Sequence, residues 1–245
     1  MAKNYTLLYG KKSIHERLKV NSQSIRNIFL CDDFNHPQIQ ALITSVGITP
    51  EYLPADKIEN MKKVKNLQGI VARVDKFIYS SFEDLLDSQK NLTPVFLDRI
   101  NDPQNLGVII RTLACLGGFC IVIPERDACH ITEAVMHVAS GGENYVQICK
   151  VADMTQAINE VKRRGVSVMG AVIDENAEDI NSLKLKFPLA IVLGAEAVGI
   201  APEIQKILDK KSYIPMHGAK LTLNVNTACA IFCNEITKQR LADSG

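Results

Sequence analysis

Six short, almost wholly apolar runs, separated by helical patterns, constrain the fold of this chain more than any other feature. They are VFLD (95–98), FCIVIP (119–124), VQICKV (146–151), VSVMGAV (166–172), LAIVLG (189–194) and SYIPM (212–216). Such runs are typical of strands in a parallel sheet that helices cover on both faces. The helical patterns cover 106–118, 131–140, 154–165, 202–210 and 224–242. The sequence therefore predicts an open parallel α/β sheet.

The first 80 residues predict a second, smaller α/β unit. Strand patterns cover 6–10, 25–31, 48–54 and 69–74, and helical patterns cover 12–20, 36–47 and 55–64. The polar stretch YSSFEDLLDSQKNLTP (79–94) ends in a proline and is typical of a linker. We therefore expect one domain over 1–80, a linker over 81–93 and a second domain over 94–245.

The composition is that of a globular protein with a sizeable core. Hydrophobic residues make up 47% and charged residues 22% of the 245 residues. The longest apolar stretches, such as PLAIVLG (188–194), are far shorter than the roughly 20 residues of a membrane span. The N-terminal MAKNYTLLYG lacks the apolar region of a secretory signal. We therefore expect a cytoplasmic protein with no membrane partner.

The cysteine and histidine patterns indicate neither a disulfide framework nor a metal site. There are 7 cysteines, without a CxxC pair, in segments that read as core. Cys229 and Cys233 are one helical turn apart among apolar neighbours, and His130 and His137 are seven residues apart with no third ligand evident. A structural metal site needs four ligands. We therefore expect reduced cysteines and no bound metal.

Charge is distributed unevenly along the chain, although the net charge is only +1. Residues 1–80 contain 12 Lys and Arg against 7 Asp and Glu, whereas residues 81–245 contain 16 against 20. Such an asymmetry is a hint of a nucleic-acid-binding module, and chance surface charge is the alternative interpretation. The residues that we select for phosphate contacts are Lys11, Lys12 and Arg17, followed by Lys62, Lys63 and Lys65.

Three strand-to-helix junctions carry polar and glycine residues within otherwise apolar sequence. They are NDPQNLGVIIRT (101–112), LGAEAVGIAPEI (193–204) and IPMHGAKLTLNVNTA (214–228). Ligands of open parallel sheets bind beyond the carboxyl ends of strands, which makes these junctions the candidate site. The first junction also contains Asp102 and Pro103 as the expected start of a helix. Neither GxGxxG nor GxxxxGK[ST], the glycine-rich phosphate-binding patterns, occurs in the chain.

Arg111 lies within the apolar run 106–116, and apolar residues surround it on every side of a helix. We therefore expect its guanidinium to be buried. Because a guanidinium stays protonated, a buried one needs an anionic or accepting partner. The partner is either a structural carboxylate or a substrate.

The three junctions resemble those of the SpoU, or TrmH, branch of the SPOUT class of S-adenosylmethionine-dependent RNA methyltransferases. The family patterns N-x-G-x-x-x-R, G-[SA]-E-x-x-G, and I-P-M followed by S-L-N-V-S stand here as NLGVIIR (105–111), GAEAVG (194–199) and IPMHGAKLTLNVN (214–226). The segment HVASGGEN (137–144) also resembles the family. In addition, LLYGKKSIHERL and NLQGIVARV resemble the L30-related substrate-binding domain of the 23S ribosomal RNA guanosine 2′-O-methyltransferases.

The resemblance implies a deep trefoil knot in the C-terminal domain, a homodimer, and S-adenosylmethionine as cofactor. The implied reaction is methylation of a ribose 2′-hydroxyl of RNA, most similar to that of a guanosine in 23S ribosomal RNA. The implied catalytic residues are Arg111, Asn105, Glu196, Asn224 and Thr222. The implied cofactor-binding residues, which act largely through their backbone, are Leu193, Gly194, Gly199, Ile214, Met216 and Leu223.

Three positions depart from the family pattern. Thr222 and Asn226 stand where the family usually has serine, and Ala197 stands where it commonly has glycine. Threonine keeps the hydroxyl, whereas we assign no catalytic role to Asn226. These departures leave open a catalytically silent RNA-binding protein, and a tRNA 2′-O-methyltransferase is the other alternative. Each polar residue taken singly also has an ordinary structural use, such as a helix cap or an arginine partner.

Overall fold

A computed structural model describes residues 4–62, 67–87, 92–196, 198–219 and 221–243. The chain forms two compact units. The first unit comprises Met1–Ile78 together with Ile131–Tyr145, and the second comprises Tyr79–His130 together with Val146–Gly245. In the part of the chain that is described, no helix is long and apolar enough to cross a bilayer.

The first unit contains a four-stranded sheet in the order β1-β4-β2-β3. β4 pairs antiparallel with β1 and β2, and β2 pairs parallel with β3. Its core includes Leu8, Ile14, Leu30 and Ile70, all fully buried. The elements of residues 4–78 are β1 (Thr6–Tyr9), α1 (Lys11–Val20), η1 (Ser22–Ser24), β2 (Ile25–Cys31), α2 (Pro37–Ser45), β3 (Glu51–Leu53), α3 (Ala55–Met61) and β4 (Ile70–Val74).

A segment from the middle of the chain completes the first unit. It contains α6 (Glu133–Ala139) and the short helix η2 (Gly142–Asn144). Glu133 accepts a hydrogen bond from the backbone N–H of Leu7 at 2.8 Å. The Arg17 guanidinium forms a salt bridge of 3.1 Å with Glu143, and both side chains are buried. Burial raises the pKa of Glu143 and outweighs the opposite effect of Arg17.

The second unit contains a seven-stranded sheet in the order β7-β6-β5-β10-β8-β11-β9. Each pair of neighbouring strands in this sheet is parallel. The predicted parallel α/β sheet is therefore confirmed. Its strands are β5 (Thr93–Asp98), β6 (Phe119–Pro124), β7 (Gln147–Val151), β8 (Ser167–Ala171), β9 (Glu178–Asp179), β10 (Leu189–Gly194) and β11 (Lys210–Tyr213). The trefoil knot stays a prediction from the family resemblance.

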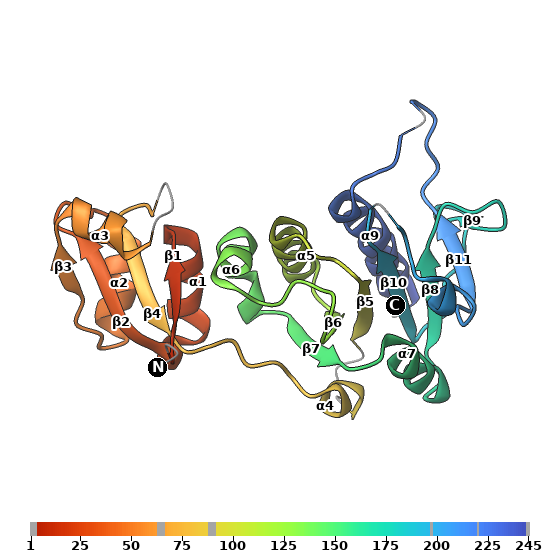
Figure 1. Ribbon diagram of the computed structural model, residues 1–245, viewed down its shortest axis with the longest axis horizontal. Helices are drawn as coiled ribbons and strands as arrows, with labels where there is room; N and C mark the ends of the chain where they lie inside the picture. Colours follow the sequence, from red (N-terminus) through yellow and green to blue (C-terminus); the bar gives the residue numbers. More distant parts are fainter. Residues whose placement is uncertain (1–3, 63–66, 88–91, 197, 220, 244–245) are drawn as a thin grey trace. The chain divides into compact units, whose positions relative to one another are not determined.

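Helices cover both faces of this sheet, as the apolar strand runs require. Figure 1 shows α5 and α9 on one face and α4 and α7 on the other. Successive side chains of each strand point to opposite faces of the sheet, and each face packs against helices. Phe96 and Val122, for example, pack with Ile158 and Val161 of α7. The helices of this unit are α4 (Phe82–Asp87), α5 (Pro103–Leu116), α7 (Met154–Arg163), α8 (Pro202–Gln205) and α9 (Val225–Asp243).

The strand ends that matter for the site lie at one edge of the sheet. Gly194 at the end of β10 is in register with Asp98 at the end of β5, so these two strands end level. α5 begins as predicted, because the Asp102 side chain accepts from the N–H of Gln104 and Pro103 is in the first turn. The last long strand differs from the prediction: β11 ends at Tyr213, so Ile214 and Met216 lie beyond it.

Candidate functional site

A cavity of about 410 Å³ lies beyond the carboxyl ends of β8, β10 and β11 in the second unit. Its volume falls within the range of small-molecule sites, about 300–1,000 Å³. All six residues selected from the sequence as cofactor-binding line it, namely Leu193, Gly194, Gly199, Ile214, Met216 and Leu223. The second and third junctions therefore form one concave site.

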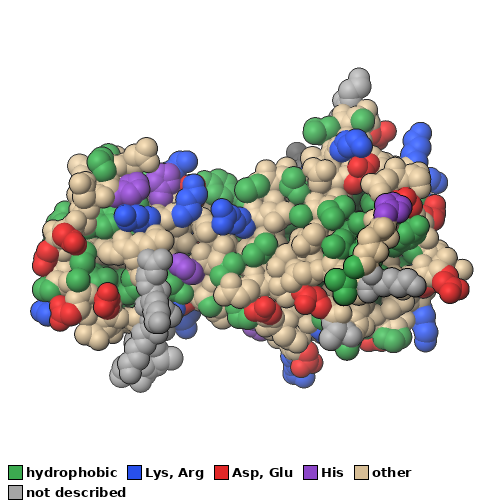
Figure 2. Space-filling model, turned by 90° about the horizontal axis from the view of Figure 1, so that it is seen from above, with side chains coloured by type: hydrophobic (Ala, Val, Ile, Leu, Met, Phe, Trp, Pro, Cys, Tyr) green, Lys and Arg blue, Asp and Glu red, His purple; other side chains and the backbone are tan. Residues whose placement is uncertain are grey.

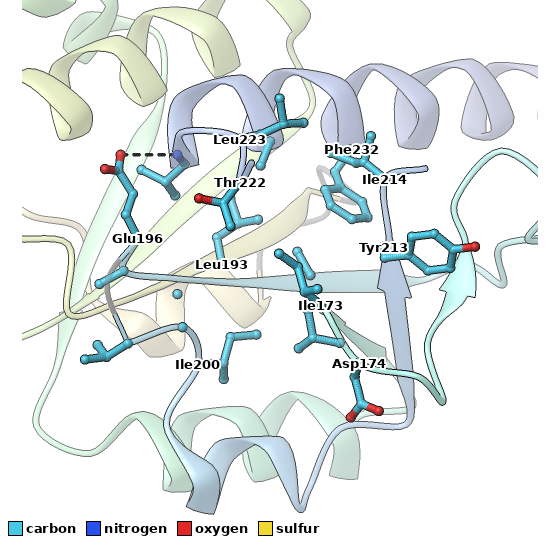
Figure 3. Close-up of a pocket in the computed structure, with 18 of the residues that line it drawn as sticks. Ile173, Asp174, Leu193, Glu196, Ile200, Tyr213, Ile214, Thr222, Leu223 and Phe232 are labelled. Atoms are coloured by element: carbon cyan, nitrogen blue, oxygen red, sulfur yellow. Dashed lines mark hydrogen bonds between the residues drawn. The ribbon is translucent and has the colours of Figure 1, made fainter. Parts of the chain in front are cut away.

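The described lining of the cavity is mainly apolar, with two acidic residues. Figure 3 shows Phe232 directed from α9 toward the strand ends, with Glu196 at one end of the cavity and Asp174 at the other. None of the described lining residues is Lys, Arg or His. A hydrogen bond from Lys211 lowers the pKa of Asp174. Because Asp174 is paired with Lys211, Glu196 is the lining carboxylate without a cationic partner among the described residues, and it favours a ligand with positive charge beside an apolar body.

The loop after β10 folds back tightly over the end of its own strand. A Cβ at Gly194 would lie 2.2 Å from the carbonyl carbon of Gly199 and 2.3 Å from the backbone nitrogen of Ile200. Only glycine fits so close an approach of backbone. The Gly199 N–H donates to the carbonyl of Ala195 at 2.7 Å, which closes the turn. This geometry explains why position 194 needs glycine.

A polar network joins all three junctions at the edge of the cavity. The amide nitrogen of Asn105, on α5, donates to Glu196 Oε1 at 3.2 Å. The same oxygen accepts from the backbone N–H of Val225 at 3.4 Å, where α9 begins (Figure 3). Asn224 donates to Asn105 Oδ1 at 3.4 Å. Three of the five residues selected as catalytic are therefore in direct contact, although their sequence positions span all three junctions.

Asn226 is a member of this network that the sequence interpretation missed. Its side-chain amide donates to Asn105 Oδ1 at 2.8 Å, a shorter distance than that from Asn224. Its backbone N–H donates to Asn224 Oδ1 at 2.7 Å, which caps the first turn of α9. The signal available in the sequence was the departure itself, an amide at the position where the family usually has serine.

Thr222 lines the same cavity, where Figure 3 places it between Glu196 and Leu223. Its residue surface is exposed, so the hydroxyl is accessible to a ligand. Ala197, the third departure from the family pattern, lies outside the described residues.

The expectation that Arg111 is buried was wrong. Arg111 is exposed, and it belongs to a stripe along α5 with Gln104, Val108 and Cys115, all of them exposed. The positions are three or four residues apart and share one helix face. Among the described residues, none forms a hydrogen bond or an ion pair with its guanidinium, so no internal acid neutralises it. Arg111 is therefore available to an external anion.

The basic residues selected in the first unit differ in their environments. Lys12 is 67% exposed and pairs with Glu16 at 3.2 Å. The Lys11 ammonium lies 5.5 Å from the centre of the Phe34 ring. Arg17, in contrast, is buried against Glu143, so its guanidinium is directed into the unit and away from solvent. Lys62 pairs with Glu133. Lys63 and Lys65 lie outside the described residues.

Figure 2 shows Lys, Arg and His side chains close together on one face of the first unit. This clustering is the electrostatic feature expected of a phosphate-binding surface. No group of three or more His, Cys, Asp or Glu residues that could hold a metal ion occurs within the described residues.

Comparison with known proteins agrees with this fold. The model of the SpoU rRNA methylase family matches residues 93–234, and that of the RNA 2′-O ribose methyltransferase substrate-binding domain matches residues 7–80. The two matches define the class of protein, an RNA methyltransferase with an added substrate-binding domain. The chain belongs to the SpoU rRNA methylase family.

Relatives match over almost the whole chain. One, assigned to the TrmH family of tRNA/rRNA methyltransferases and named YacO, from Bacillus subtilis, is 30% identical over 98% of both chains. The 23S rRNA (guanosine-2′-O-)-methyltransferase RlmB of Acinetobacter baylyi is 30% identical over 95% of this chain and 97% of its own. The crystal structure of the SpoU methyltransferase AviRb from Streptomyces viridochromogenes, in complex with AdoMet, superimposes with a TM-score of 0.80. It is 18% identical, with 98% of this chain and 92% of that chain covered.

Proposed function

We propose that the protein transfers a methyl group from S-adenosylmethionine to a ribose 2′-hydroxyl of RNA, at a guanosine of 23S ribosomal RNA. One observation carries the proposal. The Asn105–Glu196–Asn224 network joins three separate junctions at the edge of a cavity whose described lining contains acids and no bases. Membership of the SpoU family and the relative named RlmB support this reaction.

The cavity suits S-adenosylmethionine in chemistry. Its apolar lining, which includes Leu193, Ile214 and Phe232, can cover an adenine ring, and the Glu196 carboxylate complements the positive charge of the ligand. Bound there, S-adenosylmethionine would supply an electrophilic methyl group. The AdoMet complex of AviRb, which has the same fold, supports this assignment.

The residues predicted to act in the reaction have distinct roles in the proposal. Arg111 stays protonated, so it acts electrostatically on the ribose hydroxyl and its phosphate and does not accept the proton. The hydroxyl oxygen forms its bond to carbon as the carbon–sulfur bond breaks, and the hydroxyl proton leaves to solvent. Asn105, Glu196 and Asn224 fix the geometry of the site, and Thr222 offers a hydroxyl to the reactants.

The first unit is the proposed RNA-binding part. Its match to the family of substrate-binding domains and its clustered basic side chains (Figure 2) support this role. Lys11 and Lys12 are the proposed phosphate contacts. A ribosomal RNA substrate places the protein in the cytoplasm. The homodimer implied by the family resemblance is part of the same proposal.

Ribose-methylation mapping tests the proposed reaction. The protein is incubated with labelled S-adenosylmethionine and either 23S ribosomal RNA or tRNA transcripts, and the modified nucleotide is located. A single guanosine methylated in 23S RNA supports the proposal, whereas methylation of tRNA alone replaces the substrate. Absence of both methylation and donor binding by calorimetry would identify a catalytically silent RNA-binding protein.

A salt titration tests the RNA-binding surface. Charge reversal of Lys12 should weaken RNA binding and lower the slope of log K against log salt by about 0.7–0.9 for each lost phosphate contact. Charge reversal of Lys184, an exposed lysine of the second unit, is the control. An unchanged slope in the Lys12 variant would contradict the contact.

A further inference from the structure

Two consecutive residues at the end of β5, Asp98 and Arg99, hold the loop between Gly194 and Pro202. The structure describes Ala195, Glu196 and 198–201 of this loop. The loop forms one wall of the cavity, whereas neither Asp98 nor Arg99 lines it. Neither of the two residues belongs to the family patterns quoted above.

Three hydrogen bonds attach the loop to this dipeptide. The N–H of Ala195 donates to the Asp98 carbonyl at 3.1 Å, at the start of the loop. The N–H of Ala201 donates to Asp98 Oδ2 at 2.7 Å, at its end. Between them, Arg99 Nη2 donates to the carbonyl of Gly199 at 3.2 Å. The loop is therefore held at both ends and at its turn.

The Asp98 carboxylate is buried, so it needs partners to offset the loss of water. Arg99 supplies them by a two-pronged contact, with Nε 3.1 Å from Oδ1 and Nη2 3.2 Å from Oδ2. This geometry fixes the plane of the guanidinium and so aims Nη2 at Gly199. A lysine could supply the charge but not the fork.

The backbone of Arg99 adopts an unusual conformation. Its φ is +58°, in the left-handed region that favours glycine over residues with a Cβ. Glycine would adopt this turn with less strain. Arginine therefore makes side-chain contacts that glycine could not make, although its backbone is more strained than that of glycine would be.

We infer that Asp98 and Arg99 are positioning residues, which hold Ala195, Glu196 and residues 198–201 in a ligand-binding conformation and thereby set the affinity for S-adenosylmethionine without touching it. The inference rests on the proposed function for the identity of the ligand. The conformation of the loop itself depends on the hydrogen bonds above and not on that identity.

Arg99→Gly tests the side chain without adding backbone strain, because glycine adopts this φ readily and lacks the guanidinium. We expect about a tenfold increase in the Kd for S-adenosylmethionine, equivalent to the loss of one charge-assisted hydrogen bond, with thermal stability preserved. Arg99→Lys should give a smaller increase. Asp127→Gly is the matched control, since exposed Asp127 has a φ of +57° in the same unit and no hydrogen bond or ion pair with a described residue.

Hydrogen–deuterium exchange of the ligand-free protein provides a second measurement that does not depend on the ligand. The amides of Ala195, Gly199 and Ala201 should exchange faster in Arg99→Gly than in the wild type, and no faster in Asp127→Gly. If the two variants show equal exchange and equal affinity, the inference is overturned. If the wild type fails to bind S-adenosylmethionine but the exchange result holds, the proposed function fails and the positioning role stands.

Discussion

Asn105 and Glu196 are 91 positions apart in the sequence, yet the amide of one donates to the carboxylate of the other at 3.2 Å. This contact ties the first turn of α5 to the loop after β10. The carbonyl oxygen of the Asn105 amide accepts from both Asn224 and Asn226, so both ends of the amide are engaged. The orientation of Glu196 at the cavity therefore depends on the start of α9.

Removal of the Asn226 amide should impair the reaction and spare donor binding. Asn226→Ala deletes the 2.8 Å hydrogen bond to Asn105, and we expect methyl transfer to slow by about five- to tenfold. The Kd for S-adenosylmethionine, measured by calorimetry, should change little, because Asn105 keeps its hydrogen bond to Glu196. Thr227→Ala, on the same helical turn, is the control. Equal rates in the two variants would show that Asn226 is only a helix residue.

Arg111 should matter for turnover and not for donor binding. Arg111→Ala should lower the single-turnover rate by about 10²–10³, because the exposed guanidinium supplies charge to the RNA in the transition state. Arg111→Lys should recover part of the rate. Arg163→Ala, at a residue with a 71% exposed side chain on α7, serves as the control. A near-normal rate in Arg111→Ala would remove this residue from the mechanism.

Gly194 is the position where a single methyl group should be most harmful to the cavity. Gly194→Ala places a Cβ 2.2 Å from backbone, and we expect the Kd for S-adenosylmethionine to rise about 10- to 100-fold as the loop is displaced. Gly218→Ala is the matched control, since a Cβ there has no heavy atom within 4 Å and needs no positive φ. Calorimetric titration of both variants decides the matter.

The buried pair Arg17–Glu143 should show strong coupling in a double-mutant cycle. Arg17→Ala and Glu143→Ala each remove one member of a buried ion pair and should lower the free energy of unfolding by about 3–5 kcal/mol. The double variant should lose less than the sum of the two. Urea denaturation measures all three, and additive losses would indicate that the pair contributes no mutual stabilisation.

Glu16 should make stability sensitive to acid. Burial raises its pKa, but hydrogen bonds from Tyr145, Lys12 and His15 outweigh this effect and lower the pKa to about 2, from the ordinary value of 4.5. The stabilisation is therefore complete above pH 4.5 and is lost as the pH falls toward 2. Tyr145→Phe should move acid unfolding to higher pH, whereas Tyr52→Phe, at an equally exposed tyrosine, should not. Circular dichroism against pH measures both.

Much of the fold follows from periodicity, because fully buried strands and amphipathic helices leave strong patterns. Every long strand expected in the second unit is present, with only small shifts at its ends. β9, two residues long, was missed because so short a pairing leaves no pattern. The expectation of a buried Arg111 was wrong because it took apolar neighbours as a sign of burial. Val108 is apolar but 36% exposed, and it lies on the same outward-facing side of α5 as Arg111.

The sequence patterns selected residues that the structure brings together, but they did not predict the hydrogen bonds between them. The family patterns named Asn105, Glu196 and Asn224, and the structure brings them together. The hydrogen bond from Asn226 to Asn105, and those that join Asp98 and Arg99 to the loop after β10, connect distant segments of the chain. One sequence does not reveal such contacts. Arg17 was misjudged as a surface cation because the carboxylate that pairs with it lies 126 positions away.

The return of α6 and η2 to the first unit has a consequence for dissecting the protein. The polypeptide passes between the two units three times, at residues 78–79, 130–131 and 145–146. A fragment that stops near residue 80 would lack Glu133, which accepts from the Leu7 amide, and Glu143, which pairs with the Arg17 guanidinium. An isolated RNA-binding domain from this chain must therefore include residues 131–145 as well as residues 1–78.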